Sequence, residues 1–147
     1  MSAEKVSVVV VDPYHKVYGM LVPALIQRLL EAVEAFGDGS NTVVEFMTRL
    51  HAGDKGAILL AAVTPAGKVK GYAAAGTNGS EVIMIQPRLD EPTSNDAIAE
   101  MIERIEEWAK SLGAKRITLI SKRLDPKWQK KYDFEVARYV LTKELAE

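Results

Sequence analysis

One stretch, residues 80–122, constrains the fold of this chain more than any other. Here a short apolar run ends at Pro87, an acidic loop follows at residues 90–95, and a long amphipathic helix then runs to Gly113. A second apolar run, Arg116–Ile120, comes directly after that glycine turn. Apolar runs bounded by turn residues are typical of strands, so this order predicts two parallel strands joined by a helical crossover. The loop before such a helix is where a phosphate group could bind, which makes its residues informative about function.

The crossover helix shows an unbroken three-four spacing of apolar residues. The positions are Ile98, Met101, Ile102, Ile105, Trp108, Ala109 and Leu112. Charged residues fall between them on the opposite side, so the pattern predicts one face packed on a sheet and one face in solvent.

The remaining elements predict an α+β fold, in which a mixed sheet is covered by helices. Strands are expected at residues 6–11, 57–63, 69–77, 81–86 and 134–143, and helices at 17–36, 42–50 and 126–132. The valine-rich first strand is expected to be buried on both faces or nearly so. The glycine- and alanine-rich strand at 71–76 predicts close approach by a helix or by another chain. The predicted order is β-α-α-β-β-β-α-β-α-β, in one domain spanning residues 1–147.

Composition and charge exclude several functional classes. The chain has 19 basic and 20 acidic residues, a net charge of −1, so a nucleic-acid partner is not expected. It has no cysteine, which excludes disulfides, thiolate catalysis and zinc sites built on sulfur. No signal peptide and no membrane-spanning run is recognisable. His15 and His51 have no companion ligand at a suitable spacing, so no metal site is expected.

Three segments carry a resemblance to a known family. They are Ile-Gln-Pro at 85–87, Ile-Glu-Glu-Trp-Ala-Lys-Ser-Leu-Gly-Ala-Lys-Arg-Ile-Thr-Leu at 105–119, and Trp-Gln-Lys-Lys-Tyr-Asp-Phe at 128–134. Together with the element order, they resemble the GNAT-type N-acetyltransferase fold over nearly the whole chain. That resemblance implies an acyl-CoA site at the loop before the crossover helix.

The acyl-CoA motif of that family, Gln/Arg-x-x-Gly-x-Gly/Ala after the proline, is not matched here. Counted from Pro87, its basic or amide position falls on Asp90 and its small positions on Thr93 and Asn95. A diphosphate needs free backbone N–H groups, small residues and preferably a cation. Pro92 removes one donor, and the carboxylates of the loop repel an anion. The sequence therefore favours a loop in which Thr93, Ser94 or Asn95 caps the helix, with Asp96 complementing the helix dipole in the first turn.

If acyl-CoA does bind, the resemblance implies which residues would hold it. They are Ile85, Gln86, Pro87, Thr93, Ser94, Asn95 and Asp96. The strand at Ile85 and Pro87 would offer backbone hydrogen bonds to the cofactor, splayed from the parallel strand at Ile117 and Thr118.

No residue stands out as a catalytic acid or base. The tyrosine that many family members use as the acid would fall on Gln129, which cannot protonate a thiolate. Two other residues are candidates: Glu81 as a base on the fourth strand, and Tyr132 as an acid. A solvated hairpin glutamate and a tyrosine that anchors the last strand are the simpler interpretations of these two residues.

Two main functional hypotheses follow. The tracts Ala114–Trp128 and Val140–Leu145 are similar to small acetyltransferase-like proteins of tailed bacteriophages, in which the motif loop is often eroded. That similarity implies a non-catalytic protein of the host cytoplasm or virion, without a cofactor, whose partners are virion components or copies of itself. The alternative is an active acetyl-CoA-dependent N-acetyltransferase with an atypical loop. A regulatory subunit or an enzyme inhibitor is a third possibility.

Overall fold

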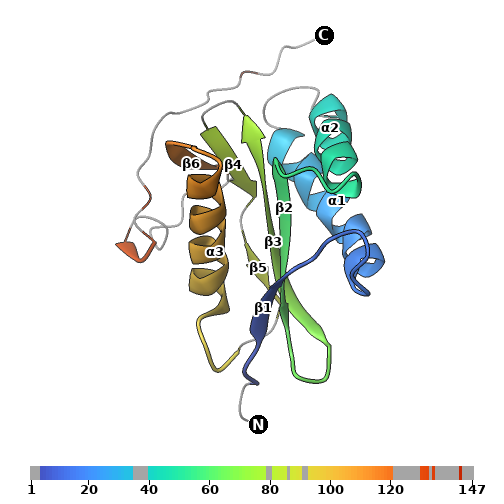
Figure 1. Ribbon diagram of the computed structural model, residues 1–147, viewed down its shortest axis with the longest axis vertical. Coiled ribbons are helices and arrows are strands. Elements are labelled where there is room, and N and C mark those ends of the chain that lie inside the picture. The colour runs from blue at the N-terminus through green and yellow to red at the C-terminus, as the bar shows by residue number, and fades with distance from the viewer. Residues whose placement is uncertain are drawn as a thin grey trace.

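One six-stranded sheet and three helices make up the part of the chain that the structure describes (Figure 1). The computed structural model describes residues 4–34, 40–78, 81–85, 87–90, 93–120, 130–132, 134 and 143. The strands are β1 (Ser7–Val10), β2 (Ala57–Val63), β3 (Val69–Asn78), β4 (Glu81–Ile85), β5 (Arg88–Leu89) and β6 (Arg116–Ile120). The helices are α1 (Tyr18–Glu34), α2 (Ser40–His51) and α3 (Ala97–Ser111). These elements confirm the predicted mixed fold class.

The sheet is antiparallel except for one parallel pair. Its strand order is β1-β2-β3-β4-β6, and β5 pairs with β3. The strands β1 to β4 are joined as antiparallel neighbours, whereas β4 and β6 run parallel from Glu81↔Arg116 to Ile85↔Ile120. The predicted meander and the predicted parallel pair joined by the crossover helix are therefore both confirmed.

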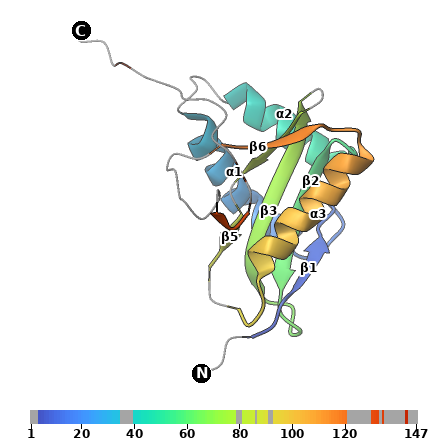
Figure 2. The same ribbon diagram turned by 90° about the vertical axis from the view of Figure 1, so that its left-hand side faces the viewer.

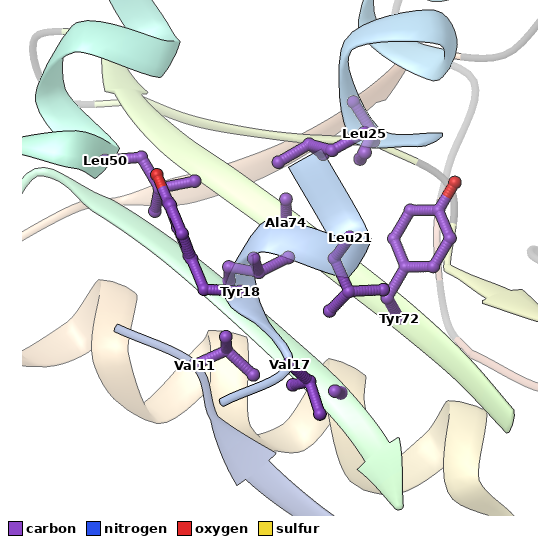
Figure 3. Packing of buried hydrophobic residues seen from close by; sticks show 11 residues of the cluster. Val11, Val17, Tyr18, Leu21, Leu25, Leu50, Tyr72 and Ala74 are labelled. Atoms are coloured by element: carbon purple, nitrogen blue, oxygen red, sulfur yellow. The ribbon is translucent and has the colours of Figure 1, made fainter. Parts of the chain in front are cut away.

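Two layers of helix cover the two faces of the sheet, with α1 and α2 on one face and α3 on the other (Figures 1 and 2). Alternation along β3 divides the core, because Tyr72 and Ala74 face α1 and α2 whereas Ala73 and Ala75 face α3. Figure 3 shows the first of these clusters, in which Leu21 of α1 lies beside Tyr72 of β3 and the ring of Tyr18 extends toward Leu50 of α2.

The helix α3 forms where its sequence pattern predicts. Met101, Ile102, Ile105 and Ala109 are buried against the sheet, on one face of the helix. After α3 ends, Gly113 adopts a positive φ of 77°, a conformation that glycine takes without steric cost.

The two-residue strand β5 is not predicted by the sequence, and it results from a bulge in the path of the fourth strand. Met84 pairs with Ala75, and Arg88 pairs with Tyr72. Met84 and Arg88 are four positions apart in the sequence, whereas their partners on β3 are only three positions apart. One extra residue is therefore accommodated between β4 and β5. After the bulge, Arg88 and Leu89 of β5 lie beside β3, whereas the last described pair between β4 and β6 is Ile85↔Ile120.

The small residues of β3 are explained by neighbours within this chain. A Cβ atom on Gly71 would lie 2.2 Å from the carbonyl oxygen of Arg88, so β5 can pair closely only because residue 71 is glycine. A Cβ atom on Gly76 would lie 3.0 Å from the ring of Phe46 in α2. The close approach predicted for this strand is therefore made by β5 and α2.

Some expectations need correction or lie outside the described residues. The strand predicted at residues 6–11 is not buried on both faces, because Ser7 is exposed and Val10 is 54% exposed. The predicted last helix and last strand fall outside the described residues, apart from positions 130–132, 134 and 143. Among the described residues, no helix has both the length and the apolar character needed to cross a membrane.

Candidate functional site

The start of α3 is capped by the side chain of Asp96. Its backbone has φ −82° and ψ 83°, and its Oδ1 accepts a hydrogen bond of 3.0 Å from the backbone N–H of Ala99. The predicted cap at Thr93, Ser94 or Asn95 is therefore wrong. The sequence places Asp96 in the first turn of the helix, but α3 begins only at Ala97. Asp96 is therefore the capping residue that precedes the first turn. An aspartate cap both satisfies a free helix N–H and complements the helix dipole.

The loop before α3 is bound to the N-terminal segment of the chain. The side-chain amide of Asn95 pairs with the backbone of Val6: Val6 N–H donates to Oδ1 at 3.0 Å, and Nδ2 donates to the Val6 carbonyl at 3.1 Å. The N–H of Ser94 donates to the carbonyl of Glu4 at 3.0 Å, and Glu4 forms a parallel bridge with Thr93. Val6 is buried, so Asn95 satisfies polar groups that water could not reach.

Within this loop, the Asn95 carbonyl is a shared acceptor. It receives the hydroxyl of Thr93 at 2.6 Å and the N–H of Ala97 at 3.0 Å. The N–H groups of Ser94, Ala97 and Ala99 are thus all bonded to acceptors of the same chain.

Charged side chains at the loop are paired as well. Arg88 Nε lies 2.8 Å from Asp90 Oδ1, and Lys131 Nζ lies 2.7 Å from Asp96 Oδ2. The Lys131 ammonium also lies 5.4 Å from the centroid of the Tyr132 ring. The hydrogen bond to Asp96 raises the pKa of Lys131, with Tyr132 adding to the shift. Burial raises the pKa of the Tyr132 phenol, and the Asp96 carboxylate raises it further.

These contacts do not suit the diphosphate of acyl-CoA. The N–H groups of Ser94, Ala97 and Ala99 already have acceptors, and the carboxylate of Asp96 lies where α3 would offer its partial positive charge. The motif positions counted from Pro87 end at Asn95, before α3 begins, so Asp96 is the residue that an anion at the helix start would meet.

The other cofactor candidates belong to the bulge. Ile85 is buried and pairs with Ile120, and Pro87 is buried between β4 and β5, while Gln86 lies outside the described residues. The expected splay at Ile117 and Thr118 is wrong. Both residues pair in register with β4, and the parallel pairing continues as far as Ile120.

The two catalytic candidates lie at opposite ends of this region. Glu81 begins β4, where its Oε2 accepts a 2.6 Å ion-pair contact from Arg116 Nε. Ile85 lies four positions further along the strand, roughly 13 Å away at the usual rise of a strand. Tyr132 instead lies near Asp96, at the start of α3. The structure therefore brings Tyr132 to the predicted loop and leaves Glu81 away from it.

Sequence analysis missed a polar pair on the other face of the sheet. The hydroxyl of Tyr18, at the start of α1, is hydrogen-bonded to Nδ1 of His51, the last residue of α2, and their ring centroids are 5.3 Å apart. His15 accepts instead from the N–H of Val17 at 3.3 Å. Among the described residues no cluster of histidine and acidic groups could hold a metal ion.

Solved acetyltransferase structures share this fold. Glucosamine-6-phosphate N-acetyltransferase from Arabidopsis thaliana matches 98% of this chain and 100% of its own, with a TM-score of 0.61 at 9% identity. The structure of AAC(6')-Iy with the bisubstrate analogue CoA-S-monomethyl-acetylneamine matches 97% of this chain and 99% of its own, with a TM-score of 0.65 at 13% identity. A predicted acetyltransferase from Clostridium acetobutylicum, solved with acetyl-CoA, matches 95% and 96%, with a TM-score of 0.61 at 16% identity.

The comparisons establish the fold and nothing finer. No protein-family model matches the sequence, and no curated protein matches it. At identities of 9–16%, structural likeness defines the architecture and leaves the activity open. The described chain thus has the GNAT acetyltransferase fold that the sequence predicts.

Replacing Asn95 should loosen the loop from the N-terminal segment. The substitution Asn95→Ala removes two hydrogen bonds to Val6, so we expect the free energy of unfolding to fall by about 1–3 kcal/mol. Asn95→Asp retains the acceptor for the Val6 N–H but places a carboxylate oxygen against the Val6 carbonyl oxygen. It should therefore also lower the free energy of unfolding. Urea denaturation measures both. Ser94→Ala is the control, because the Ser94 side chain is exposed and its backbone N–H is retained; equal losses for all three variants would contradict this role of Asn95.

Tyr18 should make the fold sensitive to alkaline pH. Burial raises the pKa of its phenol above the ordinary value of 10.0, so the folded state keeps the proton while the unfolded chain loses it. This contribution is intact below pH 10 and is lost as pH rises beyond it, by up to about 1.4 kcal/mol per pH unit.

We therefore expect the stability difference between the wild type and Tyr18→Phe to shrink when urea denaturation is repeated above pH 10. Tyr14→Phe is the matched control, because Tyr14 is 97% exposed. Stability curves of the wild type and Tyr18→Phe that stay parallel across this range would refute the assignment.

Proposed function

We propose that this chain is a non-catalytic protein of the GNAT fold that works through contacts with other protein chains, copies of itself included. The observation that carries this proposal is the loop before α3, where the N–H groups of Ser94, Ala97 and Ala99 bond to acceptors of the chain itself. An acyl-CoA enzyme of this fold would need such groups for the cofactor phosphates. A role in the bacteriophage virion is proposed from sequence resemblance alone.

The surface of the α1 and α2 layer supports an interaction role. Four large apolar side chains are exposed there or in the turn before α1: Tyr14, Met20, Leu30 and Val44. Met20 is 64% exposed and Val44 is 63% exposed. The helix α1 has no charged residue from Tyr18 to Gln27. This part of its surface would therefore not repel a partner chain electrostatically.

The alternative function, an acetyl-CoA-dependent N-acetyltransferase, has one observation in its favour. The bulge between β4 and β5 interrupts the regular pairing with β3 just after Ile85, the residue at which the described β4–β6 pairing ends. A pantetheine arm could then bind backbone groups near Ile85 and Pro87. Two of the structural neighbours were themselves solved with acetyl-CoA or with a CoA conjugate.

Titration with acetyl-CoA separates the two functions. We expect isothermal titration calorimetry to detect no binding, and the melting temperature to stay unchanged with millimolar acetyl-CoA. A ligand at a hundred times its dissociation constant would instead add about 2.7 kcal/mol to the free energy of unfolding. Saturable binding, or acetyl-CoA-dependent release of free thiol in the presence of amines, would establish the alternative.

Self-association tests the interaction role. We expect sedimentation equilibrium of the wild-type chain to show a mass that rises with concentration, and Met20→Glu to weaken the association at least about tenfold by placing a charge on the contact surface. Leu112→Glu is the control, since Leu112 is a partly exposed residue at the end of α3 on the opposite face. A wild-type chain that stays monomeric at every concentration, or an equal loss with both variants, would count against this surface.

A further inference from the structure

The carboxylate of Asp96 is held as a bound anion would be held. One oxygen, Oδ1, accepts the N–H of Ala99 at the start of α3, and the other, Oδ2, lies 2.7 Å from the ammonium of Lys131. A helix N–H, a cation and the positive end of a helix dipole are the groups with which proteins bind phosphate. Here these three act on a side chain of the same molecule.

We propose that Asp96 is the specificity-determining residue that excludes phosphate-bearing ligands from the start of α3. Its carboxylate takes the place of the ligand anion, and a phosphate could enter only by displacing it from Ala99 and Lys131. The proposal rests on the proposed function, because it explains which residue keeps a GNAT fold from holding acyl-CoA.

Among the described residues, the neighbouring acidic residues Asp90 and Glu100 do not fill this position. Asp90 is paired with Arg88, which compensates its charge, and it lies at the start of the loop, away from the N–H of Ala99. Glu100 is in the first turn of α3, one residue beyond the N–H that Asp96 caps. Asp96 alone among these three bonds both a helix N–H and a cation.

Lys131 is the second residue that would determine phosphate binding at the start of α3. Its position follows from the segment 130–132, which the fold places beside the start of α3. With Asp96 replaced, the ammonium would be available to a phosphate at the same place. The Tyr132 ring, which lies beside this ammonium, would then border the position of the phosphate.

Two graded substitutions test the proposal. Asp96→Asn removes the charge while keeping a good helix cap, so the fold should be retained. Asp96→Gly removes the charge and also frees the N–H of Ala99. The probes are inorganic diphosphate and coenzyme A, followed by isothermal titration calorimetry, with circular dichroism and urea denaturation to establish folding.

We expect no saturable binding by the wild type, measurable binding by Asp96→Asn, and binding by Asp96→Gly at least about tenfold tighter than by Asp96→Asn. Adding Lys131→Ala to Asp96→Gly should remove most of the gain. Asp90→Asn, which removes a charge from the same loop but leaves Asp96 in place, should gain nothing.

The outcomes separate this inference from the function on which it rests. If the wild type itself binds coenzyme A, the proposed function fails. If the wild type does not bind and the folded Asp96 variants do not bind either, only this inference is overturned. A gain with Asp90→Asn equal to that of Asp96→Asn, or no effect of Lys131→Ala, would also overturn it.

Discussion

The start of α3 is stabilised by acceptors that the chain itself supplies, and much of the described structure depends on that constraint. Three segments far apart in the sequence meet there: residues 4–6, the loop at 93–96, and Lys131. A helix start leaves several N–H groups without partners, and these must be satisfied by side chains, water or a ligand. In this chain the acceptors for the N–H groups of Ser94, Ala97 and Ala99 are internal, so these three groups do not need a ligand as acceptor.

The bulge after β4 and the start of α3 differ in how the chain uses its backbone groups. At the bulge, one extra residue lies between Met84 and Arg88, and β5 pairs closely with β3 where residue 71 is glycine. At the helix start, the groups that would hold phosphate hold Asp96 and the N-terminal segment instead. The fold is thus that of the GNAT structures, whereas backbone N–H groups at the start of α3 are bonded to acceptors of the chain itself.

The sequence predicts well those elements whose signal is local. The apolar spacing of α3 and the Gly113 stop each describe a few neighbouring residues, and the corresponding elements are found within one or two positions. The parallel pair β4–β6 follows from the crossover helix between them.

Contacts between distant residues leave no such pattern. Asn95 and Val6 are 89 positions apart, and Tyr18 and His51 are 33 apart, so neither pair could be found from spacing. Lys131 is one of many lysines near residue 130, and nothing in the sequence distinguishes it. Strand β5 is missed because two residues carry no periodicity. The helix cap is misplaced because Thr93, Ser94, Asn95 and Asp96 are all good capping residues, and only tertiary contacts decide among them.

The most direct measurement of the central claim is a titration of the isotopically labelled chain with coenzyme A, followed through the backbone amide resonances in NMR. The account predicts that the amide signals of Ser94, Ala97 and Ala99 keep their chemical shifts and their slow hydrogen exchange at every coenzyme A concentration. Saturable shifts confined to these three amides would show that the start of α3 accepts a phosphate-bearing ligand and would contradict the account.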